Sequence, residues 1–156
     1  MTASGSYAGR TGHRTNVQTA ALVIGAVFAL VGILGFIPGI TSNYSALGFA
    51  GAGSQAALLG IFQVSVLHNI VHLLFGAAGI AMSRNPAQSR NYLIGGGVVY
   101  LVLWLYGLIT DDRSSANFVP MNSADDWLHF VLGVAMILLG VVLSRNAGRT
   151  GTTHTV

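Results

Sequence analysis

The chain has 156 residues, of which 53% are hydrophobic and only 7% are charged. About a quarter of the residues of a soluble domain are charged, so this composition excludes an ordinary soluble protein and places most of the chain in lipid or in a buried core. The net charge of +3 comes from arginines scattered singly, which excludes a nucleic-acid-binding patch, and the absence of cysteine excludes disulfides and thiol chemistry.

Four apolar stretches follow one another along the chain, each close to the length of about 20 residues that a membrane-spanning helix needs. None contains a charged residue, whereas a surface helix of a soluble protein has a charged face. The first is too long for a signal peptide and no small-residue cleavage site follows it, so we interpret it as an uncleaved span. The sequence thus predicts an all-α membrane protein, a bundle of four transmembrane helices at 17–37, 58–82, 92–110 and 127–143.

The segments outside this 17–143 domain are polar or rich in small residues. The N-terminal tail at 1–16 and the C-terminal tail at 144–156 are polar. The loop at 38–57 has no charge, is rich in Gly, Ala and Ser, and is long for a connection between helices. We expect this loop to fold over the outer face of the bundle, although the sequence does not determine its conformation.

The arginines indicate the orientation of the four spans. Six of the seven fall on one side of a four-span topology, while Arg113 lies on the other side with all four aspartates. Short loops rich in arginine stay in the cytoplasm. The sequence therefore predicts a protein of the bacterial inner membrane with both termini in the cytoplasm, where the six arginines also lie: Arg10, Arg14, Arg84, Arg90, Arg145 and Arg149.

The second and fourth apolar stretches resemble each other. Residues 67–85 align without gaps on 128–146, with six identities in 19 positions that include His68 with His129 and Gly79 with Gly140. Both stretches end in Ser-Arg-Asn. We interpret this as a parallel 2+2 repeat of helical hairpins, because two spans return the chain to the side on which it started. His68 and His129 then lie at the same depth, roughly 22 Å from the cytoplasmic end.

Polar and small residues follow spacings of three and four along the apolar stretches, so each set shares one helical face. Small residues let helix backbones approach, and polar side chains then form hydrogen bonds across the interface. We expect helix packing at Gly25, Gly32, Gly76, Gly79, Gly133 and Gly140. We expect an interhelical polar network formed by Ser65, His68, Asn69, His72, Asp126 and His129.

Two alternatives give the histidines a chemical role. His68 and His129, at equal depth on different helices, suit bis-histidine ligation of haem b or a quinone site, although the only outer cation for haem propionates is Arg113. His68, His72 and His129 suit a metal site, completed by Asp125 or Asp126. A zinc hydrolase is disfavoured, because Asn69 occupies the place of the general-base glutamate in "HNIVH". No cofactor is the leading expectation.

Several stretches in combination resemble a known family. They are "GFIPGIT" (35–41), "LLGIFQVSVLHNIVHLLFG" (58–76), "GGGVVYLVLWLYG" (95–107) and "NFVPMNSADDWLHF" (117–130). The chain is similar over about 17–143 to a family of small bacterial four-helix membrane proteins catalogued as a domain of unknown function, DUF4383. The resemblance implies an integral inner-membrane protein with four spans and supplies no activity, cofactor or catalytic residue.

The sequence contains no catalytic motif, so we expect a non-enzymatic structural or accessory membrane subunit rather than an enzyme. Its partners are then the lipid bilayer and other membrane subunits or further copies of itself. The alternative is a membrane redox protein that binds haem or a quinone through its histidines.

Overall fold

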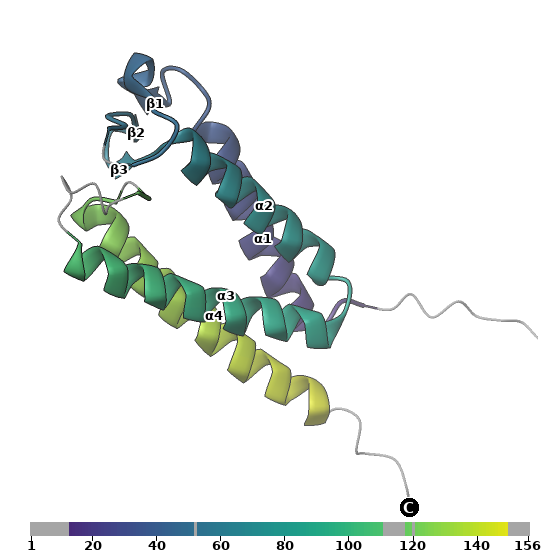
Figure 1. Ribbon diagram of the computed structural model, residues 1–156. Coiled ribbons are helices and arrows are strands. Elements are labelled where there is room, and N and C mark those ends of the chain that lie inside the picture. Colours follow the sequence, from purple (N-terminus) through teal and green to yellow (C-terminus); the bar gives the residue numbers. More distant parts are fainter. Residues whose placement is uncertain (1–12, 52, 111–117, 120, 150–156) are drawn as a thin grey trace, which may run out of the picture.

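The computed structural model describes residues 13–51, 53–110, 118–119 and 121–149, and most of these lie in four α-helices (Figure 1). The expectation of a mostly helical chain with four helices is confirmed. Three of the helices are long and apolar enough to cross a membrane, whereas α2 is apolar but shorter, with 17 residues. The helices are α1 (Asn16–Leu34), α2 (Val66–Met82), α3 (Pro86–Ile109) and α4 (Ser123–Arg149).

The helices are arranged as two antiparallel pairs. α1 packs along α2, and α3 packs along α4, while α2 and α3 contact each other only sparsely. Figure 1 shows the two pairs meeting near the short connection between α2 and α3 and diverging toward the other end, where the strands lie.

Polar residues at the helix ends explain where α3 and α4 begin. The Asn85 side chain accepts hydrogen bonds from the backbone N–H groups of Ala87 and Gln88, and proline follows it at the first helical position. α3 therefore begins at Pro86, six residues before the expected span at 92, because its first turns are polar but helical. The Asn122 side chain likewise accepts from two backbone N–H groups and caps α4.

A small three-stranded antiparallel sheet precedes α2. β1 (Thr41–Ser42) pairs with β2 (Ala57–Leu58), which pairs with β3 (Phe62–Gln63), and a 3-10 turn (Tyr44–Ala46) follows β1. Leu59 and Gly60 have φ values of 55° and 73° and make the tight turn between β2 and β3. The apolar run from 58 was expected to be helical throughout. Instead, α2 begins at Val66, after Ser65, which is the N-cap residue of the helix.

Residues 38–51 and 53–64, here called the cap, are bonded to both helix pairs. The N–H groups of Val66 and Leu67 donate to the carbonyl groups of Gly48 and Phe49, at 3.1 and 2.9 Å. Contacts with the second pair come through Asn122 and Asp125. The Asn122 amide donates to the Ile61 carbonyl at 2.8 Å, and the Asp125 carboxylate accepts from the Gln63 N–H at 3.0 Å.

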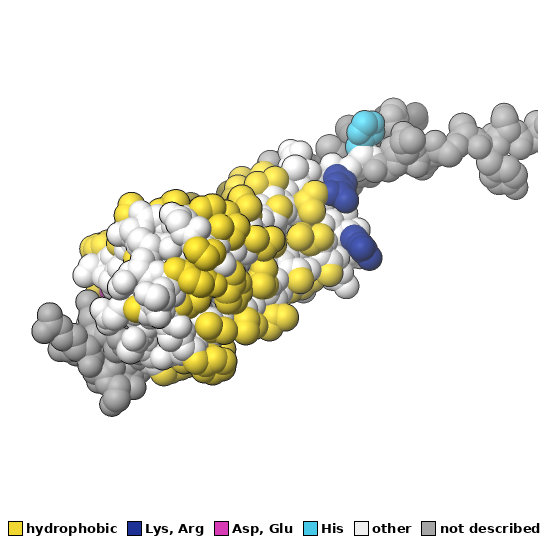
Figure 2. All heavy atoms as spheres, turned by 90° about the horizontal axis from the view of Figure 1, so that it is seen from above, with side chains coloured by type: hydrophobic (Ala, Val, Ile, Leu, Met, Phe, Trp, Pro, Cys, Tyr) yellow, Lys and Arg dark blue, Asp and Glu magenta, His cyan; other side chains and the backbone are white. Residues whose placement is uncertain are grey.

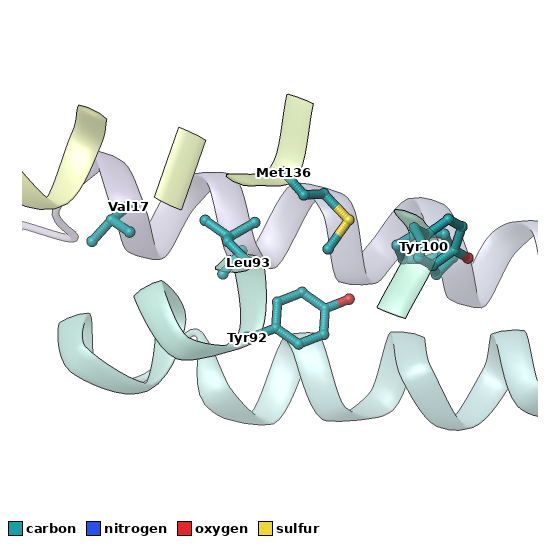
Figure 3. Close-up of a cluster of buried hydrophobic side chains, with 7 residues drawn as sticks. Val17, Tyr92, Leu93, Tyr100 and Met136 are labelled. Carbon is teal, nitrogen blue, oxygen red and sulfur yellow. The ribbon is translucent and has the colours of Figure 1, made fainter. Parts of the chain in front are cut away.

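The helices bury a hydrophobic core away from the cap. Figure 3 shows Val17 at one end of this core and Tyr100 at the other, with Tyr92, Leu93 and Met136 between them. Each of these side chains is at most 5% exposed. The core draws on α1, α3 and α4, so it joins the two helix pairs below the level of the cap.

Glycines bring the paired helices into backbone contact. A Cβ atom on Gly25 would lie 2.8–2.9 Å from backbone atoms of Gly76, Gly79 and Ile80, and one on Gly32 would lie 2.8 Å from the Asn69 carbonyl oxygen. In the second pair, Cβ atoms on Gly97 and Gly133 would lie 2.7 and 2.9 Å from each other's carbonyl oxygens, and Gly140 packs against Leu93 and Ile94.

Candidate functional site

A cavity of about 350 Å³ lies between the two helix pairs. Its walls come from α2, α3 and α4, with Ser65 and two residues that precede α4. A second cavity of about 140 Å³ lies between α1, the cap and α4. The larger cavity is lined by Ser65, Leu67, His68, Val71, His72, Phe75, Val99, Tyr100, Leu103, Phe118, Val119 and His129.

Four side chains line both cavities: His68, His72, Tyr100 and His129, here called the histidine cluster. The ring centroids of His68 and His72 are 4.4 Å apart, and those of Tyr100 and His129 are 5.0 Å apart. Phe28 of α1 contacts the cluster through His72, at 5.5 Å, and through Tyr100, at 5.2 Å. The structure thus gathers residues from three helices into one aromatic wall between two cavities.

Local structure fixes the position of the α2 histidines. Ser65 caps α2, and its side chain accepts a hydrogen bond from the backbone N–H of His68 at 3.1 Å. His68 therefore lies in the first turn of α2, directly below the cap formed by residues 38–51 and 53–64. His72 follows four residues later on the same face, which brings the two imidazole rings together.

Some polar atoms of this region have no hydrogen-bond partner among the described residues. They include the Nδ1 atoms of His72 and His129, which are buried. Buried polar groups are nearly always hydrogen-bonded. A neutral imidazole has one donor and one acceptor, so both rings retain hydrogen-bonding capacity that the described part of the chain does not use.

The predicted network residues do not all lie at the cavity. Ser65, His68, His72 and His129 line the larger cavity, but Asn69 and Asp126 do not. A Cβ atom on Gly35 would overlap the Asn69 amide, so Asn69 faces the end of α1; a Cβ atom on Gly107 would overlap the Asp126 carboxylate, so Asp126 faces α3. The network as a whole stays a prediction.

Asp125 has a structural position at the start of α4. Its Oδ2 atom accepts from the backbone N–H of Asn122, at 3.1 Å, and from that of Gln63. Since Asn122 caps the same turn, the two side chains form a reciprocal capping box. The sequence contains this signal in "NSAD", where the carboxylate lies three residues after the cap residue.

The metal and haem hypotheses concern the same histidines. Within the described ranges, no three side chains of the His, Asp or Glu type are grouped so that they could hold a metal ion. His68 and His129 line both cavities, but this placement alone does not test ligation of an iron between them. Haem binding therefore stays a prediction.

Tyr100 is the member of the cluster that sequence reasoning did not include among site residues. It lies on the face of α3 that also contains Gly96 and Trp104, spaced four residues apart. The buried Tyr100 ring contacts Phe28, Phe75 and His129. A tyrosine on a small-residue face was the available signal, since such a face packs inward.

Some of the side chains that line the larger cavity also belong to the protein surface. Three of its lining side chains, Val71, Val99 and Phe118, are also 51%, 50% and 58% exposed on the outer surface. Val71 lies on α2 and Val99 on α3, two helices that contact each other sparsely. Part of the cavity lining thus belongs to the apolar surface of the protein.

The family described as "Domain of unknown function (DUF4383)" matches residues 18–142. The chain belongs to this family, as the resemblance of its motifs predicted. No curated protein and no solved structure matches the chain.

Proposed function

We propose that this member of the DUF4383 family is an integral protein of the bacterial cytoplasmic membrane that crosses the bilayer four times, with both termini inside. We further propose that it acts as a non-enzymatic accessory or structural subunit. The observation that carries the membrane placement is the separation of charged and apolar surface. Figure 2 shows hydrophobic side chains along the middle of the molecule and arginines at one end of the visible face.

The exposed apolar residues lie on all four helices. Val27 of α1, Leu74 of α2, Val102 of α3 and Leu138 of α4 are each 48–66% exposed. Large apolar patches are rare on soluble monomers, whereas helices in a bilayer expose apolar side chains to lipid. The described arginines Arg14, Arg84, Arg90 and Arg145 lie at the starts of α1 and α3 and the ends of α2 and α4, which antiparallel packing puts at one end.

The helix α2, although short, is long enough to form the fourth span. Its 17 residues are at the lower limit of about 17–25 residues for a spanning helix and extend roughly 25 Å. The cap lies on its N-terminal end, and backbone bonds from Val66 and Leu67 to the cap satisfy groups that would otherwise face lipid. The cap therefore compensates for the missing turns.

Helix contacts support the proposed hairpin repeat. Gly79 packs on Gly25, and Gly140 packs on Ile94. From the first contact to the second, the residue number rises by 61 on the even-numbered helices (Gly79 of α2 to Gly140 of α4). It rises by 69 on the odd-numbered helices (Gly25 of α1 to Ile94 of α3). The same steps relate the contact of His72 with Phe28 to that of Gly133 with Gly97. The two pairs thus use the same packing register, with eight more residues in the first hairpin.

Reporter fusions test the topology. A reporter active only in the cytoplasm is fused after Val156 or inserted at Ser115, and a reporter active only outside is placed at the same two sites. We expect the cytoplasmic reporter to work at Val156 alone and the external one at Ser115 alone. The opposite pattern would overturn the orientation, and equal patterns at both sites would mean that α4 does not cross the membrane.

A further inference from the structure

The cap differs in charge from the other connection at the same end of the protein. Residues 38–64 contain no Asp, Glu, Lys, Arg or His, whereas residues 111–126 contain four aspartates and Arg113. Both segments join antiparallel helices at the end opposite the described arginines. Charged side chains are characteristic of segments that lie in water, so the composition of the cap indicates a less aqueous location.

Polar side chains of the cap are used for hydrogen bonds within the protein. Five of them donate to backbone carbonyl groups of the cap or of α1, at 2.6–3.1 Å: Thr41, Ser42, Asn43, Ser54 and Gln63. Where water is scarce, irregular backbone must find its hydrogen-bond partners inside the protein. The side chains of the cap supply such partners in addition to those of the small sheet.

The exposed side chains of the cap separate into a polar group and an apolar group. The polar group consists of Ser42, Asn43, Ser45 and Gln55. The Asn43 amide donates to the Gln55 carbonyl, which brings the two parts of this group together. The apolar group consists of Phe49, Leu59 and Ile61, which are 69%, 63% and 55% exposed. The cap therefore has an amphipathic surface.

Hydrogen bonds place the apolar group beside the starts of two helices. The Ile61 carbonyl accepts from Asn122, which directly precedes α4, and the Phe49 carbonyl accepts from the N–H of Leu67, in the first turn of α2. Trp127, in the second turn of α4, is also 61% exposed. The apolar group thus continues the exposed apolar surface of the helices.

Helix lengths give the depth of these helix starts in a bilayer. Val66 and Arg84 are 18 positions apart, and Ser123 and Arg145 are 22 positions apart, which correspond to roughly 27 and 33 Å along a helix. The hydrocarbon core of a bilayer is about 30 Å thick. With the arginines at the cytoplasmic boundary, a step that rests on the proposed function, α2 and α4 begin at the outer boundary of this core.

We propose that the cap is seated at the outer boundary of the hydrocarbon core, with the apolar group in contact with phospholipid acyl chains and the polar group in water. Its non-helical backbone excludes a deeper position, because lipid-exposed irregular segments do not occur within the core. Leu59 has a φ of 55°, a conformation in which Gly or Asn is usual at an exposed turn. Contact with lipid accounts for a leucine there.

Single nitroxide labels measure this placement, because the chain contains no cysteine. The full chain with Phe49→Cys, Leu59→Cys or Ile61→Cys is labelled and placed in vesicles of phosphatidylcholine and phosphatidylglycerol. Electron paramagnetic resonance then compares collisions with oxygen, which concentrates in lipid, and with a water-soluble nickel chelate. We expect the oxygen-to-nickel ratio to be severalfold higher at these positions than at Ser45→Cys in the polar group of the same cap.

Leu74→Cys provides the reference for the helices, since Leu74 is 66% exposed in the middle of α2. A high ratio at Leu74 with a low ratio at the apolar group would overturn the seating of the cap and leave the proposed spans intact. A low ratio at Leu74 would overturn the membrane placement itself, and the seating with it.

The remaining outcomes also decide the question. A ratio at Ser45 as high as that at Leu59 would contradict the amphipathic seating, and labels that neither reagent reaches would mean that protein covers the apolar group. Melting temperatures in detergent identify labelled variants that keep the parent fold. Two of the three apolar positions are sufficient for the comparison, because each is bonded or adjacent in sequence to a different part of the boundary.

Discussion

Gly25 and Gly79 face each other across the contact of α1 with α2, so closely that a Cβ atom on Gly79 would lie 2.8 Å from the Cα atom of Gly25. Their neighbour Gly76 is equally confined, since its own Cβ atom would lie 2.5 Å from the backbone nitrogen of Ala29. The obstacles at Gly76 are backbone atoms, which cannot rotate away. The contact between these two helices therefore depends on the absence of side chains.

Gly76→Ala should destabilise the protein, because the added methyl group forces two helix backbones apart. Overpacking costs about 1–3 kcal/mol, which exceeds the gain of about 1 kcal/mol that alanine brings within a helix. Gly95 of α3 is the control, since a Cβ atom there meets nothing within 4 Å. Gly95→Ala should raise the melting temperature in detergent and Gly76→Ala should lower it; the reverse order would refute the packing described for α1 and α2.

His72→Phe should leave the ligand-free protein as stable as the parent protein or more stable. The substitution keeps an aromatic ring of similar shape beside Phe28 and removes an imidazole whose Nδ1 has no described partner. A buried polar group without a hydrogen bond costs about 1–3 kcal/mol, so the gain should be at most of this order. Melting curves in detergent measure it. A marked loss of stability would show that the ring has a structural hydrogen bond.

Asp125→Ala should loosen the cap as well as the start of α4. The carboxylate accepts hydrogen bonds from Asn122 and from Gln63 in β3, and hydrogen bonds to charged groups contribute about 1.5–3 kcal/mol each. Asp125→Asn keeps one oxygen acceptor and should lose less. Hydrogen exchange of the amide of Gln63 reports the effect; unchanged protection in the alanine variant would mean that the cap holds this strand without Asp125.

Arginines added to the cap should weaken the orientation preference. Ser45 and Gly53 are exposed, and a Cβ atom on Gly53 meets nothing within 4 Å, so Ser45→Arg with Gly53→Arg leaves the fold intact. Positive charges in a short loop oppose its translocation. The fraction of chains with an active cytoplasmic reporter at Val156 should fall. Ser45→Gln serves as a control for size, and an equal fall there would mean that charge is not the cause.

Composition and spacing were sufficient to predict four helices, because the apolar runs are long and free of charge. They were insufficient at the start of α2. There the run from Leu58 is apolar enough for a helix, yet Leu59 and Gly60 adopt left-handed conformations and turn the chain into a hairpin. Only tertiary partners decide this, since the bonds that hold the hairpin beside α4 come from residues about 60 positions later.

Only part of the candidate site could be predicted from the sequence, because the rest also depends on tertiary contacts. The spacing of His68 and His72 put them on one face of a helix, and the internal alignment selected His129. The small-residue face of α3 indicated that Tyr100 points inward, but its contacts with Phe28 and Phe75 come from packing between the two helix pairs, which the local pattern does not specify. The cavity itself arises where the pairs diverge, and divergence depends on the sizes of all the side chains that hold them apart.

The cap also imposes an order on the assembly of the protein. Its strands are synthesised directly after α1, but Asn122 and Asp125, which bind β3 and its turn, emerge only with α4. Until the last helix has been synthesised and packed, the Gln63 N–H and the Ile61 carbonyl lack these partners. Until then, the side of the larger cavity that His129 of α4 lines is also missing. The end of the molecule that holds the cap can therefore close only after α4 has been synthesised.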